Sequence, residues 1–156
     1  MYIIHEQKQR SNLIVTSIYI ITFIVLFLVI INPSFLRMPD LPKVSRIILT
    51  IVLLVDIVFF KSLYELKFRV TSEGLGFGYG LLKNKFSKEN IESVLIDNSK
   101  GNFFGYGIRF SKDKTMGFIA KHGEGLRVIL KDGRNFFITM NNPQEALDII
   151  KQNNYV

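Results

Sequence analysis

The sequence predicts an α+β membrane protein, in which a two-helix transmembrane hairpin is followed by a small β-barrel or sandwich of about seven strands with a C-terminal helix as its cap. Three observations predict this fold class. Long apolar runs fill the first part of the chain, a period of two replaces them from about position 66, and an apolar helical face closes the chain. The predicted division is a hairpin over residues 1–65 and a β domain over residues 66–156.

Composition excludes several classes of protein. The chain has 156 residues, of which 48% are hydrophobic and 21% charged, and such an apolar chain is not disordered. The absence of cysteine excludes a disulfide framework, a zinc–thiolate site and a cysteine nucleophile. The formal net charge of +7 favours a partner or surface of negative charge.

The first apolar run predicts a transmembrane helix over about residues 13–32. Residues 13–31 contain no charge, no glycine and no proline. At about 1.5 Å rise per residue, a helix of this length crosses a hydrocarbon core of about 30 Å. A cleaved signal peptide is the alternative, but the run is longer than a usual apolar signal region, and no Ala-x-Ala-like cleavage site follows it.

The second run predicts a second transmembrane helix over about residues 44–64. Ile47–Val55 is free of charge, and Asp56 interrupts the apolar residues that follow. The segment between the runs cannot remain helical, because it contains Pro33, Pro39 and Pro42. These features predict a multi-pass protein of the bacterial plasma membrane with two spans. We expect the basic C-terminal domain to be cytoplasmic, and an external domain is the alternative.

Asp56 is a candidate polar site within the membrane. In an antiparallel hairpin it lies near the level of Tyr19 and Thr22, and a carboxylate there is costly unless it is protonated or hydrogen-bonded. One interpretation is a proton or ion site, or a contact to another membrane subunit. The favoured alternative is a polar clamp between the two helices through Tyr19 or Thr22.

The rest of the chain predicts short strands. Leu66, Phe68 and Val70 alternate with polar residues, as in a half-buried strand. Glycines at every second position of the segment 74–80 fall on one face of a strand, which lets the strand bend sharply or lets another backbone approach closely. Asp132-Gly133 is a strong hairpin signal, and Asn142-Pro143 predicts the start of the closing helix.

This order of strands resembles the bacterial pleckstrin-homology (PH)-like domain over roughly residues 66–153. The resemblance implies a scaffold or binding module. One departure is the acidic first turn, Ser72-Glu73-Gly74, where phosphoinositide-binding relatives carry several basic residues. The segments that carry the resemblance are Phe68–Thr71, Ile91–Val94, Tyr106–Arg109, Gly125–Arg134 and Ile138–Pro143.

Catalysis has little support in the sequence. His122 stands in a glycine-rich turn beside Glu124, and no second histidine or cysteine is near it in sequence. The Gly-x-Gly pattern over 74–80 lacks the Gly-Lys-Ser/Thr ending of a phosphate-binding loop. We therefore expect no enzyme activity, no catalytic residue, no cofactor and no metal site.

The predicted function is non-catalytic binding or scaffolding at the membrane, with the loops 97–105 and 121–125 or a sheet edge as the contact. Expected partners are the lipid bilayer, another membrane or membrane-associated protein, and a second copy of the chain, but not nucleic acid. The alternative function is an accessory subunit of a small transporter or channel that uses Asp56. The candidate binding surface consists of Phe103, Phe104, Tyr106, Arg109, Lys121 and His122.

The basic excess lies mainly in the C-terminal part. Residues 66–156 carry 14 Lys and Arg against 9 Asp and Glu. Basic residues of a tethered domain can lie against anionic headgroups at about 1 kcal/mol each. Ordinary solvated charge is the alternative, since the basic residues are spread along alternating strands.

Overall fold

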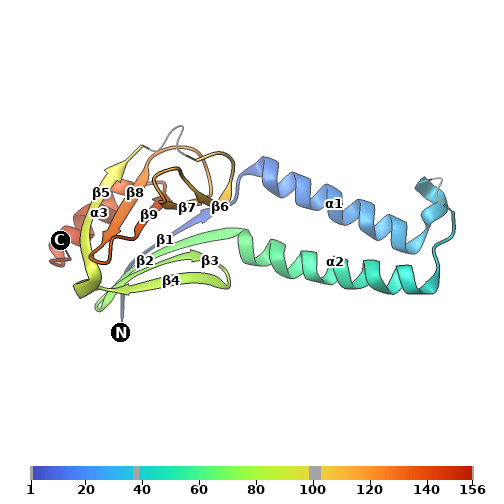
Figure 1. Ribbon diagram of the computed structural model, residues 1–156, viewed down its shortest axis with the longest axis horizontal. Helices are drawn as coiled ribbons and strands as arrows, with labels where there is room; N and C mark the ends of the chain where they lie inside the picture. The colour runs from blue at the N-terminus through green and yellow to red at the C-terminus, as the bar shows by residue number, and fades with distance from the viewer. Residues whose placement is uncertain (1, 37–38, 99–102, 156) are drawn as a thin grey trace. The chain divides into compact units, whose positions relative to one another are not determined.

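The chain folds into two units, shown in Figure 1 by a computed structural model that describes residues 2–36, 39–98 and 103–155. The helical unit comprises Leu13–Ser62, and the β unit combines Met1–Asn12 with Leu63–Val156. The first residues of the chain therefore pack with its C-terminal part. This pairing across the apolar segment was not expected from the sequence.

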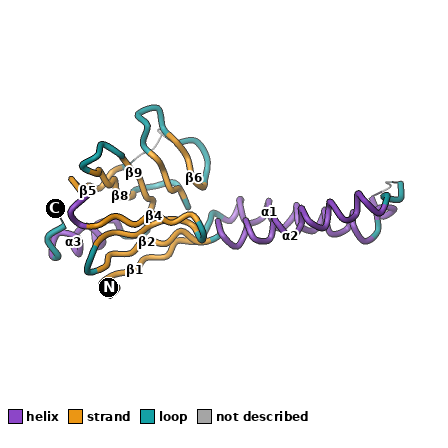
Figure 2. The backbone as a smooth tube through the Cα atoms, turned by 60° about the horizontal axis from the view of Figure 1, so that its bottom comes forward, coloured by secondary structure: helices purple, strands orange, loops and turns teal. Residues whose placement is uncertain are grey.

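The first sheet of the β unit has four antiparallel strands in the order β1-β2-β3-β4. Its strands are β1 (Ile3–Arg10), β2 (Glu65–Thr71), β3 (Gly74–Tyr79) and β4 (Leu82–Ser87). Figure 2 labels β1, β2 and β4 of this sheet, in which β3 lies between β2 and β4. Strands β2, β3 and β4 follow one another through short turns, whereas β1 reaches β2 only after the whole helical unit.

The second sheet has five strands in the order β5-β8-β9-β7-β6. They are β5 (Ile91–Asp97), β6 (Gly107–Phe110), β7 (Met116–Ile119), β8 (Gly125–Leu130) and β9 (Asn135–Thr139). The pair β7–β9 is parallel and the other pairs are antiparallel. The predicted turn at Asp132-Gly133 is confirmed, because it joins the antiparallel strands β8 and β9.

One hydrophobic core joins both sheets and the helix α3 (Pro143–Gln152). Phe77 of β3 lies at its centre, with ring centroids 5.4 Å from those of Phe118 and Phe136. Those two partners belong to the second sheet, so Phe77 links the sheets. Helix α3 begins with Pro143, as predicted, and contributes Ala146, Leu147 and Ile150 to the buried residues.

The helical unit contains α1 (Leu13–Ile31), a 3-10 helix at Pro33–Leu36 and α2 (Lys43–Leu63). The rings of Tyr19 and Phe60 lie 5.2 Å apart, so the two helices touch near these residues. Helix α1 has no buried residue. It is the only helix in the described part of the chain that is long and apolar enough to cross a membrane by length and composition.

The predicted fold class is wrong. The prediction was a two-helix transmembrane hairpin followed by a barrel or sandwich of about seven strands. The described residues instead form three α-helices and two sheets of four and five strands. Helix α2 differs from α1 because charges are spread along it, and each charge at membrane depth costs about 2.5–3.5 kcal/mol on insertion scales. These charged residues are Lys43, Arg46, Asp56 and Lys61.

Candidate functional site

Several aromatic and basic side chains are exposed on β6 and in the turns beside it. We use the name aromatic surface for Phe104, Tyr106, Arg109, Phe110 and His122. The side chain of Phe104 is 97% exposed and that of Phe110 is 69% exposed. Exposed rings of this size leave a large apolar area in contact with water, so a partner that covers them gains binding free energy.

Arg109 fixes the backbone that presents Phe104. Its Nε donates a hydrogen bond of 3.0 Å to the carbonyl oxygen of Phe104, and its Nη1 donates one of 3.0 Å to that of Ile108. Two bonds from one rigid guanidinium reduce the freedom of the exposed loop. Less conformational entropy is then lost when a partner binds there.

Tyr106 and His122 are brought together from separate turns. Their ring centroids lie 4.8 Å apart, and the Nδ2 atom of Asn12 donates a hydrogen bond of 3.0 Å to the hydroxyl of Tyr106. Lys121, predicted for the same surface, donates instead to the side-chain oxygen of Asn141. Tyr106 and His122 thus form one ordered pair of rings among the residues of the aromatic surface.

Phe103 occupies a different position from the other predicted surface residues. It is buried, and its ring stacks on Phe137 with a centroid distance of 5.5 Å. A Cβ atom at Gly117 would lie 2.6 Å from the Phe103 ring, so the ring packs directly over that glycine. Phe103 therefore anchors the segment that exposes Phe104. Residues 99–102 of the predicted contact loop lie outside the described residues.

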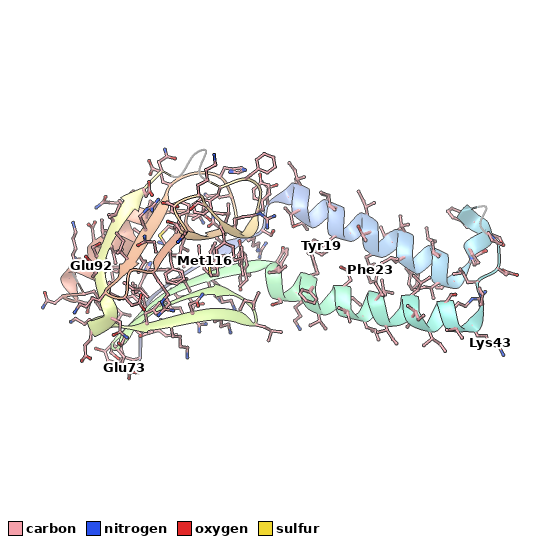
Figure 3. The ribbon with its side chains drawn as sticks, viewed as in Figure 1. Tyr19, Phe23, Lys43, Glu73, Glu92 and Met116 are labelled. Carbon is pink, nitrogen blue, oxygen red and sulfur yellow. The ribbon has the colours of Figure 1, made fainter. Side chains whose placement is uncertain are left out.

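In the helical unit, Asp56 and Tyr19 both line a hollow of about 340 Å³. Its other walls are Ile20, Phe23, Ile57 and Phe60. Tyr19 and Phe23 are labelled on α1 in Figure 3. Thr22, the third residue of the predicted polar site, donates its hydroxyl to the carbonyl oxygen of Ile18 at 2.9 Å. The structure therefore brings together Asp56 and Tyr19, while Thr22 bonds within its own helix.

A basic surface on the first sheet was not expected from the sequence. We call it the glycine groove, and it follows β2, β3 and β4 across the sheet. The signal for it was present in the alternation of basic residues along two segments that flank the glycine-rich strand. The groove is formed by Lys67, Arg69, Gly76, Gly78, Lys83 and Lys85.

Several shifted pKa values belong to structural contacts. The hydroxyl of Ser111, together with Arg127, lowers the pKa of Asp113. Arg127 also bonds Asp97 at 2.7 Å, so it ties β5 and β8 to the turn after β6. Burial raises the pKa of Tyr79, which keeps that hydroxyl neutral within the core. Among residues 2–36, 39–98 and 103–155, no group of three His, Cys, Asp or Glu side chains is placed to hold a metal ion.

Comparison of the chain with family models, with curated proteins and with solved structures found no match. The resemblance of residues 66–153 to bacterial PH-like domains therefore stays a prediction.

Proposed function

We propose that this protein is a non-catalytic binding protein of the bacterial plasma membrane, anchored by α1, with its β unit in the cytoplasm. The partner is another membrane or membrane-associated protein, which binds the aromatic surface. The observation that carries this proposal is the exposure of α1. Its 19 residues are uncharged, and none of them is buried.

An uncovered helix of this composition is unfavourable in water. Each apolar side chain left exposed forgoes the transfer free energy of burial, about 1.5–3 kcal/mol for a residue such as Ile or Phe. A bilayer covers such a helix on all sides, and the helix satisfies its own backbone hydrogen bonds there. Insertion of α1 into lipid therefore accounts for both its length and its exposure.

Strand β1 argues against a cleaved signal sequence. It precedes α1 in the chain and pairs with β2 from Ile3 to Arg10. Cleavage after α1 would remove this edge strand from the folded sheet. Arg10 pairs with Glu65, so the residues before and after the helical unit belong to one sheet of the β unit. Its excess of 14 Lys and Arg over 9 Asp and Glu in residues 66–156 favours the cytoplasmic side.

The full chain, expressed in a bacterium, is expected to stay in the membrane pellet after alkaline carbonate extraction. Arginine at both Ile21 and Val25 should release it, because each charge adds about 2.5–3.5 kcal/mol to the cost of insertion. Both positions are exposed on α1, at 60% and 44%. Immunoblots of pellet and supernatant give the distribution, and protease added outside spheroplasts should leave the β unit intact.

The matched control places arginine at Leu81 and Leu82, which are 80% and 52% exposed in the β unit. This variant carries the same added charge and should remain in the pellet. A wild-type chain found in the carbonate supernatant, or a mature chain without α1 by mass spectrometry, would contradict the anchor.

Crosslinking tests the aromatic surface. A photoreactive phenylalanine analogue at position 104 of the full chain should give a discrete adduct in native membranes, because that side chain is 97% exposed. The same analogue at exposed Glu92 serves as the control and should give none. Changing Phe110 to alanine should reduce the adduct severalfold, since aromatic side chains dominate such contacts.

Equal amounts of adduct from positions 104 and 92 would contradict the proposal that the partner binds the aromatic surface. An adduct whose amount is unchanged by Phe110→Ala would contradict it as well. An adduct with the mass of two chains would replace the separate partner by a second copy of this protein.

A further inference from the structure

Two rows of residues cross the first sheet with a glycine at the centre of each. Directly paired residues of antiparallel strands place their side chains on the same face. In each row the glycine of β3 stands between a basic residue of β2 and a lysine of β4. The rows are Arg69–Gly76–Lys85 and Lys67–Gly78–Lys83.

The missing side chain of Gly76 leaves space between the flanking cations, because a Cβ atom there would meet nothing nearer than 3.7 Å. A hollow of about 30 Å³ lies at this place, which is room for a water-sized group. A larger recess of about 600 Å³ shares Arg69, Gly76 and Lys85 with it, and Glu73 also lines that recess. The floor of glycine and the adjoining recess together allow a larger group to approach the cations.

Charge in the glycine groove is only partly neutralised. Arg69 pairs with Glu6 at 3.1 Å, and Lys67 pairs with Glu65 at 3.0 Å. Burial acts to raise the pKa of Glu6, but the hydrogen bond and charge of Arg69 outweigh it, and the pKa is lowered. The carboxylate of Glu6 therefore remains ionised beside Arg69 at neutral pH.

The two lysines of β4 have no such partner. Lys83 and Lys85 are exposed, and no carboxylate of the described residues forms an ion pair with either. Each lies across a glycine from another cation. The two residues of each such pair stand two strands apart, about 10 Å by the usual strand spacing, so an anion placed over the glycines would be attracted by both charges.

We propose that the glycine groove binds a phosphate-bearing anion, with Lys83 and Lys85 as its main cations and Gly76 as its floor. This inference goes beyond the proposed function and does not require α1 to be in a membrane. The phosphate can belong to an anionic lipid headgroup or to a soluble phosphate compound. The same recognition chemistry serves both, because ammonium and guanidinium groups bind phosphate oxygens through charge-assisted hydrogen bonds.

A structural role for the same lysines makes a different prediction. Strand β4 is an edge of its sheet, and lysines on edge strands prevent pairing with other chains. In that case their removal would cause self-association and leave anion binding unaffected. A change at Gly76 separates the two roles, because it fills the floor of the groove and keeps every charge.

The test uses the full chain in a non-ionic detergent and isothermal titration calorimetry. The probes are dihexanoyl phosphatidylglycerol, inorganic pyrophosphate and, as the zwitterionic control, dihexanoyl phosphatidylcholine. We expect saturable binding of one or both anionic probes and none of the control. The double variant Lys83→Ala/Lys85→Ala should weaken that binding by about tenfold or more, given the usual contribution of a well-placed cation.

The matched control is Lys112→Ala/Lys131→Ala, which removes the same charge from exposed positions outside the groove. Its affinity should stay within about twofold of wild type, as expected for lysines at a distance. Gly76→Ala should also weaken binding, and it should fold normally because its new Cβ meets nothing nearer than 3.7 Å.

Binding of phosphatidylglycerol alone identifies a lipid headgroup as the ligand, and binding of pyrophosphate identifies a soluble phosphate. The absence of saturable binding for both probes would overturn the proposal. Equal losses in the two double variants, or full affinity with new self-association in Lys83→Ala/Lys85→Ala, would overturn it as well. A failure of membrane anchoring would leave all these outcomes unchanged, so the two proposals fail separately.

Discussion

Replacing Phe77 with alanine is expected to destabilise the β unit by about 3–5 kcal/mol, the usual cost of deleting a buried aromatic ring. Phe77 is 2% exposed and contacts the rings of Phe118 and Phe136 in the opposite sheet. Its loss would leave a cavity between the two sheets. Because folded domains are stable by only about 5–15 kcal/mol, this change removes a large share of the total.

The measurement is thermal unfolding of the detergent-solubilised full chain, followed by near-ultraviolet circular dichroism of its aromatic side chains. The midpoint should fall by about 12 °C or more, since 1 kcal/mol corresponds to about 4–8 °C in a domain of this size. Phe104→Ala is the matched control and should change stability by less than about 0.5 kcal/mol because its ring is exposed. Similar midpoints for the two variants would contradict the central place of Phe77 in the core.

Gly78→Ala is expected to cost about 3 kcal/mol, through backbone strain and overpacking together. The φ angle of Gly78 is +144°, which side chains rarely adopt, and a Cβ atom there would lie 2.1 Å from the carbonyl oxygen of Leu82. That oxygen belongs to the backbone of the neighbouring strand and cannot move without disturbing the β3–β4 pairing. The variant should therefore unfold at a lower temperature or fail to accumulate.

Gly76→Ala is the matched control on the same strand. Its added Cβ meets ordinary contacts at 3.7 Å and 3.8 Å, so stability should change by no more than about 1 kcal/mol. Hydrogen exchange of the β3 and β4 amides in the full chain compares the two variants locally. Equal protection in both would show that the close approach of backbone at Gly78 is not decisive.

The glycine pattern of β3 was only partly informative about the structure. Alternation with a period of two placed these glycines on one face and left open a sharp bend of the strand or close approach of another backbone. The structure shows close approach of another backbone at Gly74 and Gly78. The pattern did not show that Gly76 is open while Gly78 is not. That difference depends on the position of β4, whose backbone passes 2.1 Å from the Cβ site of one and 3.7 Å from that of the other.

Strand β1 could not be predicted from its own residues. Ile4 packs against the core, but the most buried side chain of the strand is the polar Gln9, which is 6% exposed. Its Oε1 accepts a hydrogen bond of 3.2 Å from Thr139, a residue far along the chain. Pairing with β2 across the whole helical unit, rather than intrinsic preference, makes this segment a strand.

For the candidate sites too, the sequence gives the residue types, and the fold decides which of them lie together or exposed. Phe103 and Phe104 are the same residue type at adjacent positions, yet Phe103 is buried and Phe104 is exposed. Only the packing of Phe103 against Phe137 and Gly117 distinguishes them. The lysines of the glycine groove come from separate segments, and their grouping depends on strand register. Asp56 and Tyr19 meet at one hollow, whereas Thr22 turns to its own helix.

The sequence by itself determined the features that depend on neighbouring residues: the uncharged helix α1, the turn at Asp132-Gly133 and the start of α3 at Pro143. The backbone preferences of turn residues and the length of an apolar run are properties of a short segment, so these features can be predicted from that segment alone. Only the tertiary structure decided the two-sheet division, the place of β1 and the assembly of the aromatic surface and glycine groove. Those features join residues far apart in the chain, and the free energy that fixes them comes from pairing and packing across that distance.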